Sequence, residues 1–236
     1  MKNLQYFVLL TFLFTSCASS VQAKRCNEKA TQGDLCYASF DEIHPTQFVL
    51  GKLSIGPKTA KIEKMGKKGK IEKYLRSKTA PAIIGPDGLF YITDRHHTSF
   101  SILNSKLSNK YKKLYIKVVQ NWSRLSYKDF SNRMTAHNYA WLRDQNHKLR
   151  NFTELPKHIN NLEDDPYRSL AWLVRENGGF RKTGISFQEF YWGMFFKVQG
   201  IKLKNSSEMA IKAVLKQALK LAHSKKASHL PGYISN

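Results

Sequence analysis

The sequence predicts an α+β fold with a small mixed sheet and a helical C-terminal extension. Two apolar runs, residues 82–84 and 89–92, flank the turn residues 86–88 and are typical of a β-hairpin. Residues 114–120 alternate in polarity and are rich in β-branched side chains, which favours a strand. From about residue 165 onward, apolar side chains recur at helical spacing.

The first 23 residues have the pattern of a signal peptide. Lys2 supplies a positive charge, residues 6–14 form an apolar core, and Ala23 ends a small-residue cleavage site. This core is far shorter than the roughly 20 residues that span a bilayer. We therefore expect a periplasmic or secreted protein with no transmembrane helix in the mature chain. An alternative is a lipoprotein anchored through Cys17, which ends a lipobox-like sequence.

Cleavage after Ala23 leaves Cys26 and Cys36 as the two cysteines of the mature chain. In an oxidising compartment, an isolated pair at this spacing is typical of a disulfide. The surrounding residues 24–44 are polar, and we expect them to form an N-terminal arm that leads into the domain. The disulfide would pin this arm, and neither cysteine is expected to be a catalytic thiol.

The segment between the arm and the hairpin is expected to contain one strand and two short helices. Residues 48–55 predict a strand that ends at the Gly-Pro pair of residues 56–57. Residues 58–78 have helical spacing, but two glycines within residues 66–70 predict a basic kink between two helices.

A polar cluster follows the hairpin directly, where the second strand ends and a helix begins. Its six residues are Asp94, Arg95, His96, His97, Thr98 and Ser99. Unpaired backbone N–H groups and the positive end of the helix dipole meet at such a junction, so it suits an anion such as phosphate. A second interpretation is purely structural: Asp94 caps the helix and the histidines are solvated first-turn residues.

Beyond residue 120 the chain is expected to be mainly helical, and the last three helices have a start signal. These helices are residues 126–135, one from the N-cap Asp165 and Pro166 to residues 178–179, one capped by Ser186, and a long one opened by residues 205–208. Residues 137–143 are either a short strand or an aromatic edge. The lysine-rich face of the last helix is expected to be solvated.

The strand, the residues Asp94-Arg95-His96-His97 and the following helix resemble the signature of the ParB-like nuclease family, a branch of the ParB/sulfiredoxin fold. Residues 164–179 and 230–233 also resemble that family. The resemblance covers about residues 45–233. It implies one ParB/sulfiredoxin-like domain with C-terminal helices from about residue 165 and nuclease-type activity. Together with the signal-peptide pattern, it indicates an exported bacterial member of that family.

The resemblance makes residues 94–99 the favoured site, and phosphodiester hydrolysis then gives its members roles. His96 and His97 are candidates for general acid or base, because imidazole titrates near neutral pH. Asp94 is expected to orient a histidine or to help bind a divalent metal ion, which is the one cofactor suggested here. The residues expected to hold the phosphate are Arg95, Thr98 and Ser99.

ParB-type members carry an arginine shortly after the histidine of this turn, and that arginine contacts nucleotide phosphate. Thr98 stands at this place here, so the resemblance implies phosphate binding through Arg95 or through a residue elsewhere. The sequence has no Walker-type loop, no Gly-x-Gly-x-x-Gly, no paired-cysteine zinc pattern and no His-Glu-x-x-His.

The chain carries 39 Lys+Arg against 17 Asp+Glu, a formal net charge of +22. Such an excess favours a nucleic acid, another polyanion or an anionic membrane surface as partner, although a solvated lysine-rich surface gives the same count. Three functions remain open at this point: an exported nuclease or phosphodiesterase, a non-catalytic module that binds nucleic acid or another anion, and a cell-envelope protein that binds anionic lipid or polysaccharide.

Overall fold

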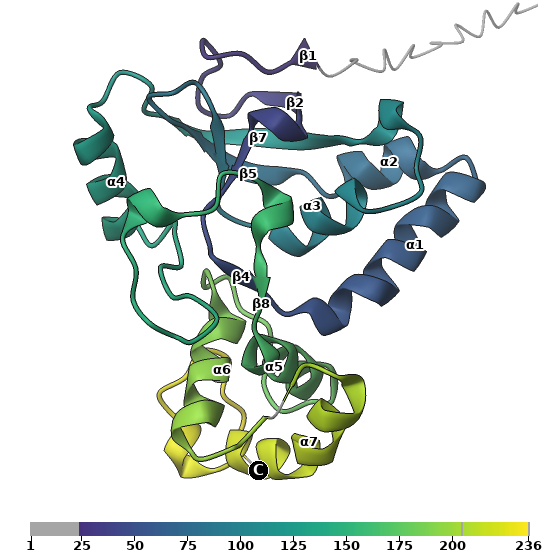
Figure 1. The fold of residues 1–236 in the computed structure, drawn as a ribbon, viewed down its shortest axis with the longest axis vertical. Helices are drawn as coiled ribbons and strands as arrows, with labels where there is room; N and C mark the ends of the chain where they lie inside the picture. Colours follow the sequence, from purple (N-terminus) through teal and green to yellow (C-terminus); the bar gives the residue numbers. More distant parts are fainter. Residues whose placement is uncertain (1–23, 204, 236) are drawn as a thin grey trace, which may run out of the picture.

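The structure is a computed structural model that describes residues 24–203 and 205–235. The expected signal peptide of residues 1–23, and with it Cys17, lies outside the described residues. The chain forms a mixed sheet flanked by helices, and its last helices gather at one end of the molecule (Figure 1). This arrangement confirms the predicted α+β class with a helical C-terminal region.

The main sheet has six strands in the order β1-β2-β7-β5-β6-β3. Their bounds are β1 (Lys24–Arg25), β2 (Leu35–Ser39), β3 (Ile43–Pro45), β5 (Ala80–Ile84), β6 (Phe90–Ile92) and β7 (Lys113–Asn121). β5 and β6 pair antiparallel with Ala82 opposite Ile92, which confirms the predicted hairpin. β5 also pairs in parallel with β7, the strand expected near residues 114–120.

Residues 24–44, expected to form an arm, contribute β1, β2 and most of β3 to this sheet. β2 pairs antiparallel with β7, and β1 pairs in parallel with β2. The predicted disulfide between Cys26 and Cys36 is present and joins β2 to the residue that follows β1. Polar side chains at a sheet edge face solvent on one side, so an edge strand can look like a loop in the sequence.

Seven α-helices are found among the described residues. Their bounds are α1 (Ile55–Lys67), α2 (Ile71–Arg76), α3 (His96–Leu103), α4 (Tyr127–Ala136), α5 (Pro166–Glu176), α6 (Gln188–Val198) and α7 (Glu208–Ala222). The break between α1 and α2 confirms the predicted kink at the glycine-containing basic run. In the described part of the chain, no helix has both the length and the apolar character needed to cross a bilayer.

The remaining regular elements are short. They are the two-stranded sheet of β4 (Val49–Leu50) and β8 (Glu163–Asp164), and the 3₁₀ turns η1 (Phe40–Glu42), η2 (Lys52–Ser54), η3 (Asn109–Tyr111), η4 (Phe152–Glu154), η5 (Ile159–Asn161) and η6 (Lys225–Ala227).

The strand predicted over residues 48–55 is wrong in its length. β4 contains only two residues, η2 follows it, and α1 already begins at Ile55. Gly56 and Pro57 therefore lie in the first turn of α1 and do not end a strand. The N–H groups of a helix's first turn have no partner within the helix, so a proline there removes no helical hydrogen bond.

Two other helix signals had different outcomes. Asp165 caps α5 as predicted, because its Oδ1 accepts the N–H groups of Tyr167 (2.8 Å) and Arg168 (3.2 Å). Ser186 does not cap α6, since that helix begins after Phe187, which has a left-handed backbone and no side-chain cap. Residues 137–143 form only isolated bridges and are the aromatic edge.

The sheet and the C-terminal helices meet where η2 contacts the start of α5. The N–H of Lys52 donates to Asp164 Oδ1 (2.8 Å), and the N–H of Leu53 donates to Ser169 Oγ (3.2 Å). Gly51 lies so close that an added Cβ would stand 2.8 Å from the backbone nitrogen of Ser169. Only glycine fits there, so the chain is pressed directly onto the backbone of α5.

Hydrophobic packing supports both halves of the molecule. Ile62 of α1, Ile71 of α2 and Ile102 of α3 are buried in one cluster with residues of the sheet such as Ile84 and Ile116. A second cluster joins α5, α6 and α7, and a third, rich in aromatic rings, joins α6 to the hairpin and to α4. The contact between the main sheet and the C-terminal helices is therefore closely packed.

Candidate active site

The predicted polar cluster lies where β6 leads into α3. Arg95 precedes the helix with a φ of 72°, in the left-handed region that non-glycine residues rarely occupy. The Asp94 Oδ1 accepts the N–H of Arg95 (2.6 Å), and no side chain among the described residues caps α3. Asp94 is therefore not a helix cap in this structure, and the first N–H groups of α3 keep their positive potential.

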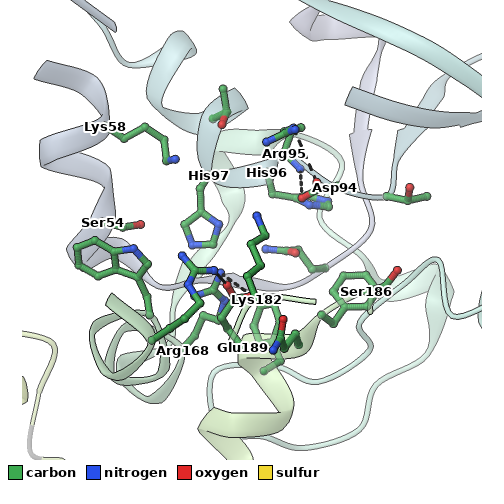
Figure 2. A pocket seen from close by; sticks show the side chains of 18 of the residues that line it. Ser54, Lys58, Asp94, Arg95, His96, His97, Arg168, Lys182, Ser186 and Glu189 are labelled. Carbon is green, nitrogen blue, oxygen red and sulfur yellow. Dashed lines mark hydrogen bonds and ion pairs between the residues drawn. The ribbon is translucent and has the colours of Figure 1, made fainter. Parts of the chain in front are cut away.

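This junction opens into a cavity of about 630 Å³, which we call the α3–α5 cleft. One wall comes from α1, α2 and the start of α3, and the other from α5, residues 182–187 and the start of α6 (Figure 2). Residues 94–98 of the predicted cluster line the cleft, and Thr98 is nearly buried. Ser99 is fully buried and is not among the lining residues.

Positive side chains dominate the cleft. Seven lysines and arginines line it against two carboxylates: Lys58, Lys61, Lys78, Lys182, Arg95, Arg168 and Arg175 against Asp94 and Glu189. Burial lowers the pKa of the Lys58 amine, and the neighbouring charges of Lys78, Arg95, Arg168 and Lys182 lower it further. Cations crowded in this way favour the binding of an anion, which would relieve their mutual repulsion.

Arg168 of α5 has donors that no part of the described chain satisfies. Its side chain is 11% exposed, and its guanidinium carbon lies 5.3 Å from the centre of the Phe190 ring. Nη2 is 3.6 Å from a Glu189 carboxylate oxygen, whereas Nε and Nη1 are buried without a hydrogen-bond partner among the described residues. Unpaired buried donors are costly, so an acceptor supplied by a ligand would stabilise this arrangement.

Glu189 holds the arginines of this wall in place. It pairs with both Arg168 and Arg175. Burial alone would raise the pKa of the Glu189 carboxyl, but the two guanidinium charges outweigh this and lower it, so the group is ionised at neutral pH. Burial lowers the pKa of Arg168, and the Glu189 charge opposes that shift. One carboxylate between two arginines leaves the wall with net positive charge.

His96 lines the cleft but is only 3% exposed. Its Nε2 accepts the backbone N–H of Thr46 (3.0 Å). Burial lowers its pKa to about 4, against a smaller opposing effect of the Asp94 charge. His96 is therefore neutral at pH 7, with its proton on Nδ1 and its Nε2 lone pair already in use.

His97 is half-buried, and Figure 2 shows it between Lys58 and Arg168. Its Nε2 accepts the N–H of Gly51 (3.1 Å), so this imidazole also carries its proton on Nδ1. Burial lowers its pKa well below the usual range, and the charges of Arg168 and Lys58 add to the effect. A bound anion would offset these two charges and raise the pKa of His97.

A metal ion has few protein ligands here. In residues 24–203 and 205–235, no three His, Cys, Asp or Glu side chains come together as a group that could hold one. Asp94 is largely exposed, and Glu189 is engaged by two arginines. The divalent ion suggested for Asp94 therefore lacks partner ligands of these types among the described residues.

The α5 residues of the cleft were not among the predicted site residues. Arg168, Trp172 and Arg175 stand four and three residues apart, which places them on one face of a helix. All three line the cleft. The same spacing holds for Ser54, Lys58 and Lys61 at the start of α1, which also line it. Two pairs of cations at helical spacing, Arg168 with Arg175 and Lys58 with Lys61, were the sequence signal that could have indicated the opposing walls.

Comparisons with known proteins place the chain in a family and identify a similar structure. The family described as "Putative ParB-like nuclease" matches residues 36–198, which include both the β6–α3 turn and the α5 arginines. The chain is also similar to protein Atu1540 from Agrobacterium tumefaciens, whose crystal structure superposes with a TM-score of 0.72 at 29% sequence identity. That similarity covers 86% of this chain and 98% of the other. No curated protein matches the chain.

Proposed function

Because the chain belongs to the family described as "Putative ParB-like nuclease", we propose that it is a nuclease or phosphodiesterase that acts on a phosphate ester, nucleic acid above all, in the α3–α5 cleft. The observation that carries this proposal is Arg168, a residue that lines a cationic cavity and has two buried N–H donors without a partner among the described residues. Phosphate oxygens are good acceptors for guanidinium N–H groups.

In this proposal the cations bind the phosphate and stabilise its transition state. Arg168 donates to the phosphate oxygens, while Lys58 and Arg95 approach from the other wall. Hydrolysis adds charge to the equatorial oxygens of the phosphorus, and fixed donors in a cavity shielded from water stabilise that charge strongly. Thr98 lines the same cleft with a hydroxyl donor. Ser99 has no role in the proposal, because it does not reach the cleft.

The two histidines take different roles. His97 lies in the cleft beside Arg168, and its Nδ1–H donates to the bound ester. To take up a proton, its Nε2 must exchange the Gly51 N–H for the substrate or for water. His96 is a positioning residue, because it holds the backbone at Thr46 and is shielded from solvent. Asp94 acts on His96 only through its charge.

A non-catalytic protein that binds nucleic acid or another anion at the cell envelope is the second candidate. The observation in its favour is that the Nε2 atoms of both His96 and His97 already accept backbone N–H groups. Neither lone pair is free for general base catalysis, although every cation remains available for binding. This candidate predicts salt-dependent binding without turnover.

We also propose that the protein acts outside the cytoplasm. The Cys26–Cys36 disulfide supports this location, since disulfides persist in oxidising compartments. N-terminal sequencing of the protein recovered from a bacterial envelope fraction is expected to begin at Lys24. A lipid on Cys17 would replace this proposal with the membrane-anchored alternative, and an intact Met1 in the cytoplasm would overturn export.

The test of function is turnover by the mature protein on DNA, RNA and a chromogenic phosphodiester, each with and without a chelator. Wild type is compared with Arg168→Gln and with Arg124→Gln, a control at an exposed arginine away from the cleft. We expect Arg168→Gln to lose most turnover and Arg124→Gln to keep it. Binding that depends on Arg168 without any turnover would establish the second candidate. If Arg168→Gln kept both binding and turnover, the cleft would be ruled out as the site.

A further inference from the structure

Trp172 stands apart from the other tryptophans of this chain. Trp122, Trp141 and Trp192 each contact other aromatic rings. Trp172 is only partly buried, lines the α3–α5 cleft, and contacts no aromatic ring and forms no hydrogen bond within the described residues. Tryptophan is enriched at interfaces because it combines a large apolar ring with an N–H donor, so Trp172 is a candidate contact for a ligand in the cleft.

The position of Trp172 ties it to the phosphate-binding group. It follows Arg168 by four residues on α5, so the indole and the guanidinium project from the same face of the helix. Arg175, one turn further on, lines the cleft as well. A polynucleotide repeats a phosphate and a planar base along its chain, which is the pair of groups that an arginine and a neighbouring tryptophan recognise.

The opposite wall repeats this combination. Tyr74 of α2 lines the cleft with its ring, and the Lys78 amine lies 5.5 Å from the centre of that ring. Lys58 and Lys61 project from α1 beside it. Each wall therefore carries an aromatic ring beside cations, a combination found in proteins that bind single strands by stacking their bases and tracking their backbone.

The size of the cleft selects the form of the nucleic acid. Its volume of about 630 Å³ is in the range of sites that enclose one small molecule, not a double helix. In a duplex both faces of a base are stacked on neighbouring pairs, and freeing one costs unstacking and unpairing energy. A single strand exposes base faces without that cost, and only a protruding phosphate can reach Arg168 at 11% exposure.

We propose that the α3–α5 cleft takes one nucleotide of single-stranded DNA or RNA, with its phosphate on Arg168 and its base on Trp172. This inference rests on the phosphate site of the proposed function but does not require hydrolysis. It assigns Trp172 to substrate binding and predicts that duplexes are bound only weakly, through the exposed basic surface.

The test measures the dissociation constants of the mature protein for four labelled ligands of equal phosphate number by fluorescence anisotropy. The ligands are a short single-stranded DNA, its RNA counterpart, an abasic single strand and a blunt hairpin duplex. The proteins are wild type, Trp172→Ala, Trp172→Phe, Arg168→Gln and, as an exposed aromatic control outside the cleft, Tyr127→Ala. Measurements at about 50 and about 200 mM salt separate the contribution of exposed charges.

We expect Trp172→Ala to weaken binding of the single strands about tenfold, which is in the range of one stacked base. The abasic strand should bind wild type about tenfold less tightly and should be unaffected by the substitution, because it has no base to lose. Trp172→Phe should restore most of the affinity, and Tyr127→Ala should change nothing. A difference between the DNA and RNA strands would identify which of the two the cleft prefers.

Equal effects of Trp172→Ala on the base-containing and abasic strands, or tighter binding of the duplex by wild type, would overturn the inference. Either result can occur while Arg168→Gln still weakens every ligand, and the phosphate site of the proposed function would then stand. If Arg168→Gln changes no dissociation constant, the proposed function fails together with this inference.

Discussion

At the scale of single residues, the neighbouring histidines show how the backbone determines the chemistry of a side chain. His96 and His97 both accept N–H groups from the segment between β3 and η2, through Thr46 and Gly51. This fixes both rings as neutral imidazoles with the proton on Nδ1. A sequence can indicate that two histidines start a helix, but it does not show which nitrogen the backbone occupies.

The buried state of His96 predicts a loss of stability in acid. Its pKa is about 4 in the folded protein and about 6.5 when unfolded, so the unfolded chain binds more protons between these values. The contribution is fully present above about pH 6.5, declines by roughly 3 kcal/mol towards pH 4, and stays lost below. Denaturant unfolding across this range, for wild type and His96→Gln, measures it.

Glutamine does not titrate and can still accept the N–H of Thr46. The stability difference between wild type and His96→Gln should therefore shrink as the pH falls from 7 to 4. Curves that stay parallel over this range would show that His96 is not held neutral by burial. Carboxylates such as Glu189 titrate in both proteins and cancel in the difference.

His97 allows a separation between positioning and proton transfer. His97→Ala should lower turnover by about 10²–10⁴-fold if the imidazole acts as acid or base. His97→Gln keeps an acceptor for the Gly51 N–H but transfers no proton, so it should lose as much. His158→Ala removes an exposed histidine outside the cleft and should be neutral. Full activity in His97→Gln would mean that His97 only positions Gly51.

Arg95 combines an unfavourable backbone with a useful side chain. A left-handed conformation costs a non-glycine residue about 1 kcal/mol, and such outliers persist where function maintains them. Arg95→Gly should therefore be more stable than Arg95→Ala by about 1 kcal/mol in thermal or denaturant unfolding. Both variants should bind a phosphate ester equally weakly. Equal stability of the two would remove the strain argument.

At the scale of elements, sequence signals succeeded where one local cause determines the structure. The hairpin follows from a turn between two apolar runs, and α5 follows from the capping side chain of Asp165 before a proline. The sequence signals failed where contacts between distant segments determine the local structure. Residues 48–55 look like a strand because they are apolar, but Gly51 and η2 are held against α5 by Asp164 and Ser169.

The candidate site was only half visible in the sequence for the same reason. The turn at residues 94–98 is contiguous, so its polar cluster can be recognised directly. Arg168 and Trp172 come from a helix some seventy residues later, and their place in the cleft depends on how α5 docks against η2. Ser99 was assigned to the site because it adjoins Thr98 in the sequence. It lies one position further along α3, and its side chain is fully buried.

The disulfide between Cys26 and Cys36 is expected to stabilise the edge of the sheet. Cys26→Ser should lower the free energy of unfolding by about 2–4 kcal/mol, because the bridge restricts the unfolded chain and anchors the β1–β2 edge. Phosphate-ester binding should not change, since none of residues 24–46 lines the cleft. Denaturant unfolding with and without reductant tests this, and mass spectrometry should find no free thiol. Two alkylatable thiols in the native protein would contradict it.

At the scale of the whole molecule, the positive charges behind the net charge of +22 differ in how strongly solvent screens them. Lys212, Lys216 and Lys220 are exposed on α7, where water and salt screen them. Five of the seven cations of the α3–α5 cleft are partly buried, so their field is screened less, whereas Lys61 and Lys182 are exposed. The surface lysines should increase the rate and salt dependence of encounter with a polyanion, and the cleft should determine where it binds.

The measurement that tests this account most directly is a crystal structure of the mature protein with a short single-stranded oligonucleotide. We expect a phosphate oxygen at hydrogen-bond distance, about 2.7–3.2 Å, from Nε or Nη1 of Arg168, with His97 beside it. A donor that is now unpaired would then be satisfied. An oligonucleotide bound on the lysines of α7, with the Arg168 donors still unpaired, would contradict the assignment of the α3–α5 cleft as the functional site.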